Sequence, residues 1–188
     1  NDVFDTFIGG IKKMAGILVI IICAWGVGGV CGDLGTSTFI VDSTIDIIPA
    51  SLVPAMLFLI GSIISFATGT SWGTMAILLP LGIHMAYGFG VSEYITIAAV
   101  LSGSLFGDHC APISDTTVMS SMAAGCNHIE HVKTQIPYAL LAAVSAFIAY
   151  LILGFTELSA IIALPIAIAI LVVLYMLAVK VFHGEKTS

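Results

Sequence analysis

Two segments of small polar residues interrupt long apolar stretches, and they hold the side chains that could do chemistry. The first segment, residues 67–74, supplies the hydroxyl groups of Thr68, Thr70, Ser71 and Thr74. The second segment supplies hydroxyl groups and carboxylates from Ser104, Asp108, Ser114, Asp115, Thr116 and Thr117. These oxygens are hard ligands, which suit Na⁺ better than they suit a soft metal. The two segments therefore predict oxygen ligands for a hard cation.

The composition indicates that both segments lie in a membrane. Of 188 residues, 59% are hydrophobic and 9% are charged, whereas soluble domains have about 45–50% apolar and about 25% charged residues. A water-soluble enzyme and a disordered tail are therefore excluded as first interpretations. The sequence has no arginine and a net charge of −6, so it offers no basic patch for nucleic acid. We expect membrane lipid, and no nucleic acid, among its partners.

Several stretches are long enough to form helices that cross the bilayer. Residues 14–33, 136–154 and 158–182 each have the apolar length of one span. Residues 93–125 predict a fourth span that is broken at mid-membrane. Pro112 lacks an amide donor there, and Ser114 and Asp115 are side chains that favour a new helix start.

A re-entrant helical hairpin is predicted over residues 53–86. Its two apolar stretches, 53–66 and 75–85, have at most 14 residues each, which is short for a full span. Residues 36–48 are amphipathic and are expected to lie at the membrane interface. The predicted fold is thus all-α, a polytopic membrane protein in which residues 1–188 form a single transmembrane transporter domain.

The lysines predict the orientation of the chain in the membrane. Counting the crossings above puts every lysine on one side: Lys12, Lys13, Lys133, Lys180 and Lys186. The opposite side receives no lysine and four acidic residues: Asp42, Asp46, Glu93 and Glu157. The positive-inside rule makes the lysine side, with both termini, cytoplasmic. Two full spans in place of the hairpin would give the same orientation.

The two carboxylates of the broken span are predicted to differ in their electrostatic surroundings. Asp108 follows the negative end of the first half-helix, which favours a cation, whereas Asp115 begins the second half-helix at its positive end. We therefore expect Asp108 to be the more easily protonated when the cation is absent. A carboxylate that holds either H⁺ or Na⁺ would exchange the two ions by competition. His109 could relay protons or be a hydrogen-bonded filler, and Trp72 is expected to pack the hairpin tip.

Other interpretations of these residues stay open. Single Ser and Thr hydroxyls in membrane helices often bond to the preceding turn. The segment Cys126-Asn127-His128-Ile129-Glu130-His131 resembles metal-ligand spacing, but nothing fixes a fourth ligand, so a solvated loop is favoured over a zinc site. The four cysteines lie in or beside apolar stretches and are expected to be buried thiols without disulfides.

At the two polar segments the sequence resembles the NhaC-type Na⁺/H⁺ antiporter family of the ion-transporter superfamily. The matching stretches are FATGTSWGTMAILLPLGI (66–83), SGSLFGDHCAPISDTTVMSSMAAGC (102–126) and HIEHVKTQIPYAL (128–140). The resemblance implies two inverted repeats, each with a re-entrant hairpin and a broken helix, and a cation bound between the hairpin tip and the break. It also implies a homodimer that moves its substrate by an elevator-like displacement.

Position by position, the resemblance implies a specific set of cation ligands: Thr68, Thr70, Ser71, Asp108, Ser114, Asp115 and Thr117. Asp108, Asp115 and His109 are the residues expected to couple transport to protons. Only one hairpin and one broken helix are found, so the chain is expected to be the C-terminal repeat of such a protein and to need an N-terminal repeat.

The predicted function is secondary active exchange of Na⁺ for H⁺ across the cytoplasmic membrane. We expect no enzyme activity, no cofactor and no metal besides the transported Na⁺. An alternative is a Na⁺- or H⁺-coupled carrier of a small carboxylate such as malate or lactate, which the absence of an arginine clamp disfavours. A remote alternative is a membrane-embedded metalloenzyme that uses His109, His128 and His131.

Overall fold

The computed structural model describes residues 4–9, 11–12, 22, 26, 30, 33–35, 39, 42–43, 47–156 and 160–184. The first predicted span and the amphipathic segment therefore lie outside the described residues, except for isolated positions. From residue 47 onward the described chain is helical and has no strand. Its elements are η1 (Ala50–Leu52), α3 (Val53–Thr68), α4 (Ser71–Phe89), α5 (Glu93–Cys110), α6 (Asp115–Ala123), α7 (His128–Thr156) and α8 (Ala160–Gly184).

Four stretches of the described chain are long and apolar enough to cross a membrane: residues 50–68, 71–89, 128–156 and 162–180. The chain is thus an all-helical polytopic membrane protein, as predicted. Two of the four stretches contain α3 and α4, which the sequence analysis assigns to the hairpin. The expected broken span appears as α5 and α6, separated by residues 111–114.

The turn between α3 and α4 is much shorter than predicted. Only Gly69 and Thr70 separate the two helices, so most of residues 67–74, which lie between the two apolar stretches in the sequence, belong to α3 and α4. The hydroxyls on either side are satisfied inside the helices, because Thr68 Oγ1 donates to Ile64 O at 2.8 Å and Thr74 Oγ1 donates to Thr70 O at 2.9 Å. The helices have 16 and 19 residues, about 24 and 28 Å at the usual rise, so the two stretches are longer than predicted.

Helix α5 is held against α3 by small residues that let the two backbones approach closely. A Cβ atom added at Gly103 would overlap the carbonyl of Phe58, and one added at Gly107 would overlap the carbonyl of Ser62. Small residues four apart are a common way to pack membrane helices. Ser65 Oγ also donates to Ser104 O at 2.6 Å across the same interface. This contact fixes the end of α5 beside the tip of the α3–α4 hairpin.

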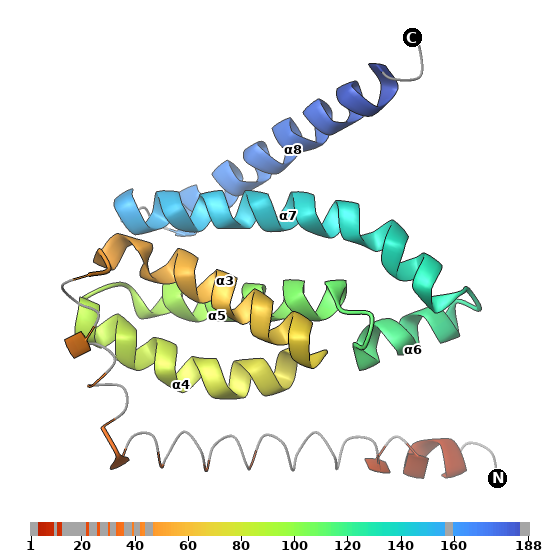
Figure 1. The fold of residues 1–188 in the computed structure, drawn as a ribbon, viewed down its shortest axis with the longest axis horizontal. Coiled ribbons are helices and arrows are strands. Elements are labelled where there is room, and N and C mark those ends of the chain that lie inside the picture. Colours follow the sequence, from red (N-terminus) through yellow and green to blue (C-terminus); the bar gives the residue numbers. More distant parts are fainter. Residues whose placement is uncertain are drawn as a thin grey trace.

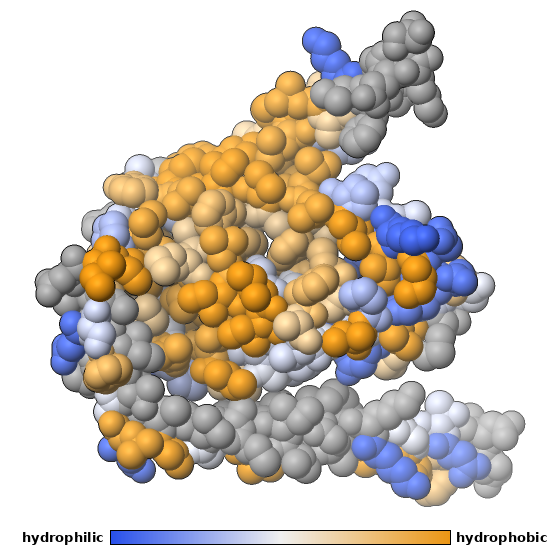
Figure 2. All heavy atoms as spheres, in the orientation of Figure 1, coloured by the Kyte–Doolittle hydropathy of each residue, from blue (hydrophilic) through white to orange (hydrophobic). Residues whose placement is uncertain are grey.

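Figure 1 shows α3, α4 and α5 side by side, with α7 along the face of α3 and α5 that is opposite α4. Phe58 on α3 packs against Phe147 and Tyr150 on α7, with ring centroids 6.5 and 5.6 Å apart. Helix α8 leaves this bundle at an angle (Figure 1). The surface in Figure 2 is largely apolar, and hydrophilic residues gather where α6 and the start of α7 lie. This distribution suits helices that face lipid.

Candidate cation-binding site

Asp108 lies in the last turn of α5 and is almost fully buried, with 1% of its surface exposed. Its Oδ2 atom accepts a hydrogen bond from Ser71 Oγ at 3.2 Å and another from Thr116 Oγ1 at 3.0 Å. Ser71 is the first residue of α4, and Thr116 belongs to the first turn of α6. The hairpin tip and the helix break, which are far apart in sequence, therefore meet at one carboxylate.

Local sequence explains why α5 and α6 are separate helices. Pro112 lacks an amide hydrogen, so α5 ends at Cys110, and the Ala111 amide caps it by donating to Gly107 O and Asp108 O at 3.1 Å each. Ser114 then caps α6, because its Oγ accepts from the Thr117 amide at 3.3 Å. The break places the C-terminal end of one helix and the N-terminal ends of two others around Asp108.

Two buried polar atoms on α5 have no hydrogen-bond partner: Asp108 Oδ1 and Ser104 Oγ. The two residues are one helical turn apart, so their side chains leave the same face of α5. Leaving a buried polar atom unpaired costs about 1–3 kcal/mol, and more for a charged group. Such atoms point to a missing partner. For a carboxylate oxygen, a bound cation or a proton can be that partner.

The contact at the hairpin tip depends on Gly69. This residue has a φ of +67° and ends α3, a conformation that glycine adopts without strain. A Cβ atom there would lie 2.8 Å from Ile113 Cγ1 and 2.9 Å from Ile113 O, in the break between α5 and α6. The tip and the break therefore touch through backbone as well as through the Ser71–Asp108 hydrogen bond.

The other predicted ligands are arranged less uniformly. Ser114 and Thr117 are buried beside the break, whereas Asp115 is exposed at the start of α6. Thr70 is the N-cap of α4, where its Oγ1 accepts from the Gly73 amide at 3.4 Å. Thr68 is exposed, and its hydroxyl bonds only within its own helix. Of the seven predicted ligands, Ser71 and Asp108 are joined side chain to side chain across two elements, and Ser114 and Thr117 are joined through the Thr117 amide.

Two further side chains lie beside the site without contacting Asp108. His109 is exposed, and its Nδ1 lies 2.7 Å from Leu105 O. Because a carbonyl only accepts, Nδ1 carries the hydrogen and Nε2 is left as the free ring nitrogen. Trp72 is 55% exposed, so the described chain covers less than half of it at the hairpin tip.

Thr116 and Ser104 are functional candidates that the sequence analysis counted among the oxygens of the second polar segment but that the family resemblance did not place in the ligand set. Both belong to the second polar segment, but their types resemble those of their neighbours and no spacing rule singles them out. Thr116 follows Asp108 by eight residues across a proline, so its approach depends on the angle at the break.

No metal cluster of the zinc type is found among the described residues. Nowhere in that part of the chain do three or more His, Cys, Asp or Glu side chains gather in a way that could hold a metal ion. His128, which belongs to the predicted zinc-like segment, instead lies 2.6 Å from Pro112 O through Nε2.

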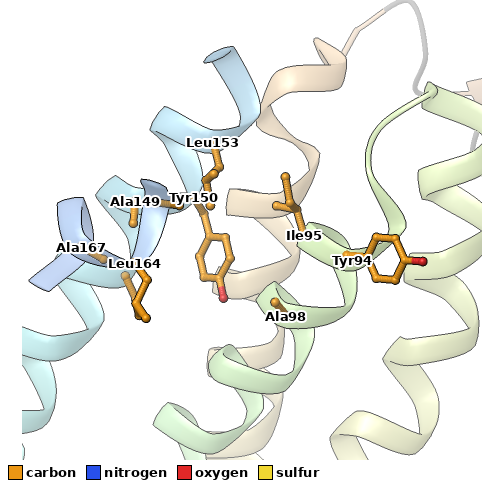
Figure 3. Close-up of a pocket in the computed structure, with 10 residues that line it drawn as sticks. Tyr94, Ile95, Ala98, Ala149, Tyr150, Leu153, Leu164 and Ala167 are labelled. Carbon is orange, nitrogen blue, oxygen red and sulfur yellow. The ribbon is translucent and has the colours of Figure 1, made fainter. Parts of the chain in front are cut away.

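A separate cavity of about 390 Å³ lies between α5, α7 and α8 (Figure 3). Its lining is almost wholly apolar and includes Tyr94, Ile95, Ala98, Tyr150 and Leu164. The Tyr150 hydroxyl is already within 2.8 Å of Ser102 Oγ. This cavity lacks the charged oxygens that a cation needs, so the site at Asp108 is the stronger candidate.

Several known proteins are similar in sequence to this chain. The chain is 41% identical over 152 residues to an uncharacterized protein of Haemophilus influenzae, covering 80% of this chain and 29% of that protein. It is 29% identical over 161 residues to the malate-2H(+)/Na(+)-lactate antiporter of Bacillus subtilis, covering 82% and 33%. It is 26% identical over 157 residues to the Na(+)/H(+) antiporter NhaC of Alkalihalophilus pseudofirmus, covering 82% and 33%.

The chain therefore spans about a third of the length of these relatives. No solved structure matches it. The model of the Na⁺/H⁺ antiporter family matches residues 1–155, which is most of the chain. On the strength of that match, and of the polar segments brought together at Asp108, this chain belongs to the Na⁺/H⁺ antiporter family.

Proposed function

We propose that this chain forms the ion-exchange half-site of a secondary transporter that exchanges Na⁺ for H⁺. The observation that carries the proposal is the buried carboxylate of Asp108. Its Oδ2 is held by hydroxyls from α4 and α6, and its Oδ1 is buried without a partner. Membership of the Na⁺/H⁺ antiporter family supports the same function.

The exchange follows from the charge of a buried carboxylate. An ionised carboxylate away from water is unfavourable unless a partner neutralises it. Na⁺ at Oδ1 or a proton on the carboxyl group each supplies that partner, but the proton removes the charge that attracts Na⁺. The two ions therefore compete for Asp108, and each loading favours release of the other.

Additional ligands for Na⁺ are available from the same break. We assign this role to the hydroxyls of Ser71 and Thr116, which can rotate to offer lone pairs, and to the predicted ligands Ser114 and Thr117. Asp115 and His109, both exposed toward the outside of this chain, are proposed to pass protons to and from Asp108. The remaining predicted ligands, Thr68 and Thr70, already have local hydrogen bonds.

The carrier of a small carboxylate remains the second candidate function. One relative is named a malate-2H(+)/Na(+)-lactate antiporter. The first turns of α4 and α6 both point hydroxyls toward the break, and helix N-termini attract anions. In that case Na⁺ or H⁺ at Asp108 would be the coupling ion and the carboxylate would bind nearby.

The setting of this site is proposed on the same basis. We place the chain in the cytoplasmic membrane, with its lysine-bearing loops and both termini on the cytoplasmic side, because lysines favour that side. We propose that the complete transporter is a homodimer in which an N-terminal repeat closes the half-site. It acts as a transporter rather than an enzyme and needs no resident cofactor.

The test is proton movement in vesicles that contain the full-length protein. Addition of Na⁺ should release protons in a pH-gradient dequenching assay, and Asp108→Asn should abolish this response, because an amide neither carries the charge that attracts Na⁺ nor releases a proton. Glu130→Gln is the matched control, because Glu130 is an exposed carboxylate whose partner is Lys133. An Asp108→Asn protein that keeps the full Na⁺ response would refute the proposal.

The same assay separates the two candidate functions. Na⁺, Li⁺, K⁺, malate and lactate are added in turn to identical vesicles. A proton signal with Na⁺ alone supports cation exchange. A proton signal that requires malate or lactate would refute simple cation exchange and support the carboxylate carrier.

A further inference from the structure

The imidazole of His128 joins three segments of the chain beside the break between α5 and α6. His128 is the first residue of α7 and is half-buried. Its Nε2 lies 2.6 Å from the carbonyl oxygen of Pro112, between α5 and α6, and its Nδ1 lies 3.1 Å from Ser121 Oγ on α6. One ring thus connects the break, α6 and α7.

The partners of the ring dictate where its hydrogens lie. A carbonyl oxygen only accepts, so Nε2 must carry a hydrogen to bond to Pro112. Ser121 Oγ also lies 2.9 Å from Val118 O, another acceptor, and a serine has a single hydroxyl hydrogen. When the Ser121 hydroxyl donates this hydrogen to Val118 O, Ser121 Oγ can only accept a hydrogen bond from Nδ1.

The full set of contacts is therefore complete only when both ring nitrogens carry hydrogens. The charged imidazolium satisfies Pro112, Ser121 and Val118 together. In the neutral ring Nδ1 has no hydrogen and must accept the hydrogen bond from the Ser121 hydroxyl. That hydroxyl then no longer donates to Val118 O. Deprotonation of His128 thus removes one hydrogen bond from the join between the break and α6.

The titratable and charged groups on the adjoining elements have other positions or partners. Asp115 lies at the opposite end of α6, and Cys110 is buried at the end of α5. Asp108 is held by Ser71 and Thr116. In the loop and α7, Cys126 Sγ donates to Ser121 O at 3.5 Å, Glu130 pairs with Lys133 at 2.8 Å, and His131 lies one turn further along α7.

We propose that His128 is a positioning residue for the ion site and that its protonation clamps α6 to the break. Helix α6 has nine residues and carries Thr116, a donor to Asp108. Ser114 caps its start, and His128 ties its last turns to Pro112. Protonated His128 holds Thr116 against Asp108, and loss of the proton frees α6. The effect on transport rests on the proposed function, whereas the clamp is a property of the fold alone.

Cys110 reports the state of the clamp directly. This thiol is 5% exposed and lies two residues before Pro112, so opening of the break uncovers it. We would use the full-length protein with its other cysteines replaced by alanine, and measure labelling by a membrane-permeant maleimide from about pH 5.5 to about pH 8.5, the range in which histidine titrates. Thiol ionisation raises labelling with pH in every variant, so the variants are compared at each pH.

His128→Gln supplies the decisive comparison, because glutamine can contact Pro112 and Ser121 but cannot gain a proton. The rise in Cys110 labelling across this pH range should be about fivefold smaller in His128→Gln than in the parent, the equilibrium value of one hydrogen bond. Ser121→Ala, which removes the Nδ1 acceptor, should flatten the profile in the same way. His131→Gln is the matched control and should keep the parental profile.

Equal pH profiles in His128→Gln and the parent would overturn the clamp, as would a His131→Gln profile that is flattened to the same degree. Na⁺-driven proton movement is measured on the same variants, and its pH midpoint should shift in His128→Gln but not in His131→Gln. Proton movement that is absent in the parent refutes the proposed function, while the Cys110 profile still decides whether the clamp exists.

Discussion

At Asp108 the two oxygens of one carboxylate have different surroundings. Oδ2 accepts from Ser71 and Thr116, and Oδ1 is buried with no partner. A proton or Na⁺ therefore has an oxygen available on one side, while the other side stays fixed to α4 and α6. The hydroxyls that hold Oδ2 are expected to tune how strongly Oδ1 attracts a cation.

Thr116→Val tests this tuning with nearly unchanged side-chain volume. Removing the donor to Oδ2 should weaken apparent Na⁺ affinity by about ten- to a hundredfold, because hydrogen bonds to a charged group are worth about 1.5–3 kcal/mol. The measurement is the Na⁺ concentration that gives half-maximal proton release. Thr134→Val is the control, since Thr134 is exposed and bonds only to its own helix. Equal affinities in the two variants would contradict the assigned role.

Thr68 and Ser71 lie at the same hairpin tip, but the Thr68 hydroxyl bonds within its own helix whereas the Ser71 hydroxyl bonds to Asp108. Thr68→Val should change apparent Na⁺ affinity by less than about twofold, because its hydroxyl bonds only within α3 and these bonds contribute little to stability. Ser71→Ala should weaken affinity about tenfold, because it removes a donor to the carboxylate. A larger loss in Thr68→Val than in Ser71→Ala would restore Thr68 as a ligand.

Among the elements, the hairpin tip and the helix break are joined by close backbone contact. The sequence predicted the break well, since Pro112 ends α5 and Ser114 caps α6 as their types indicate. It predicted the tip less well, because hydroxyls that could line a loop instead bond back into α3 and α4. Composition alone does not distinguish these two uses of a hydroxyl. Position in the helix does.

Gly69→Ala tests the contact between the tip and the break against a closely matched control. Gly69 and Gly90 both end helices with a φ of +67°, but a Cβ atom would meet Ile113 only at Gly69, and nothing lies within 4 Å at Gly90. Both changes should cost about 1–2 kcal/mol, because alanine is strained in the left-handed conformation. Gly69→Ala should also displace the break and lower Na⁺-driven proton release about tenfold more than Gly90→Ala does, a loss typical of a misplaced ligand.

Two measurements on Gly69→Ala and Gly90→Ala distinguish backbone strain from displacement of the break. Thermal unfolding in detergent reports the shared strain, and transport reports the added displacement. If Gly69→Ala and Gly90→Ala lose transport equally, the contact with Ile113 does not position the site.

In the whole molecule, the apolar surface and the polar surface lie on different parts of the helix bundle. Apolar side chains cover α8, where Leu164 and Met176 are 64% and 65% exposed, and hydrophilic side chains gather near α6 and the start of α7 (Figure 2). Such a distribution suits a bilayer in which one end of the bundle reaches the aqueous phase. The described chain leaves Asp115 and Thr116 exposed at the polar end of the bundle.

The orientation is tested by which side of the membrane reaches Cys126. Cys126 is exposed in the loop between α6 and α7, and Ser92 is exposed between α4 and α5. In protein with its other cysteines replaced, a membrane-impermeant maleimide should label Cys126 only in inside-out vesicles. Ser92→Cys should be labelled only in right-side-out vesicles, because it lies on the lysine-free side. The reverse pattern would invert the proposed topology.

The sequence by itself determined that the chain is a helical membrane protein and where its broken helix is interrupted. The length of an apolar stretch and the missing amide hydrogen of proline both act locally. It also indicated which residues hold hard oxygen ligands. Only the tertiary structure decided that Ser71 and Thr116 both reach Asp108, that Thr68 does not, and that His128 binds Pro112. Those contacts depend on the close approach of α3 and α5 at Gly103 and Gly107, and on the angle at Pro112. Both are set by packing between segments far apart in the chain, which no local pattern records.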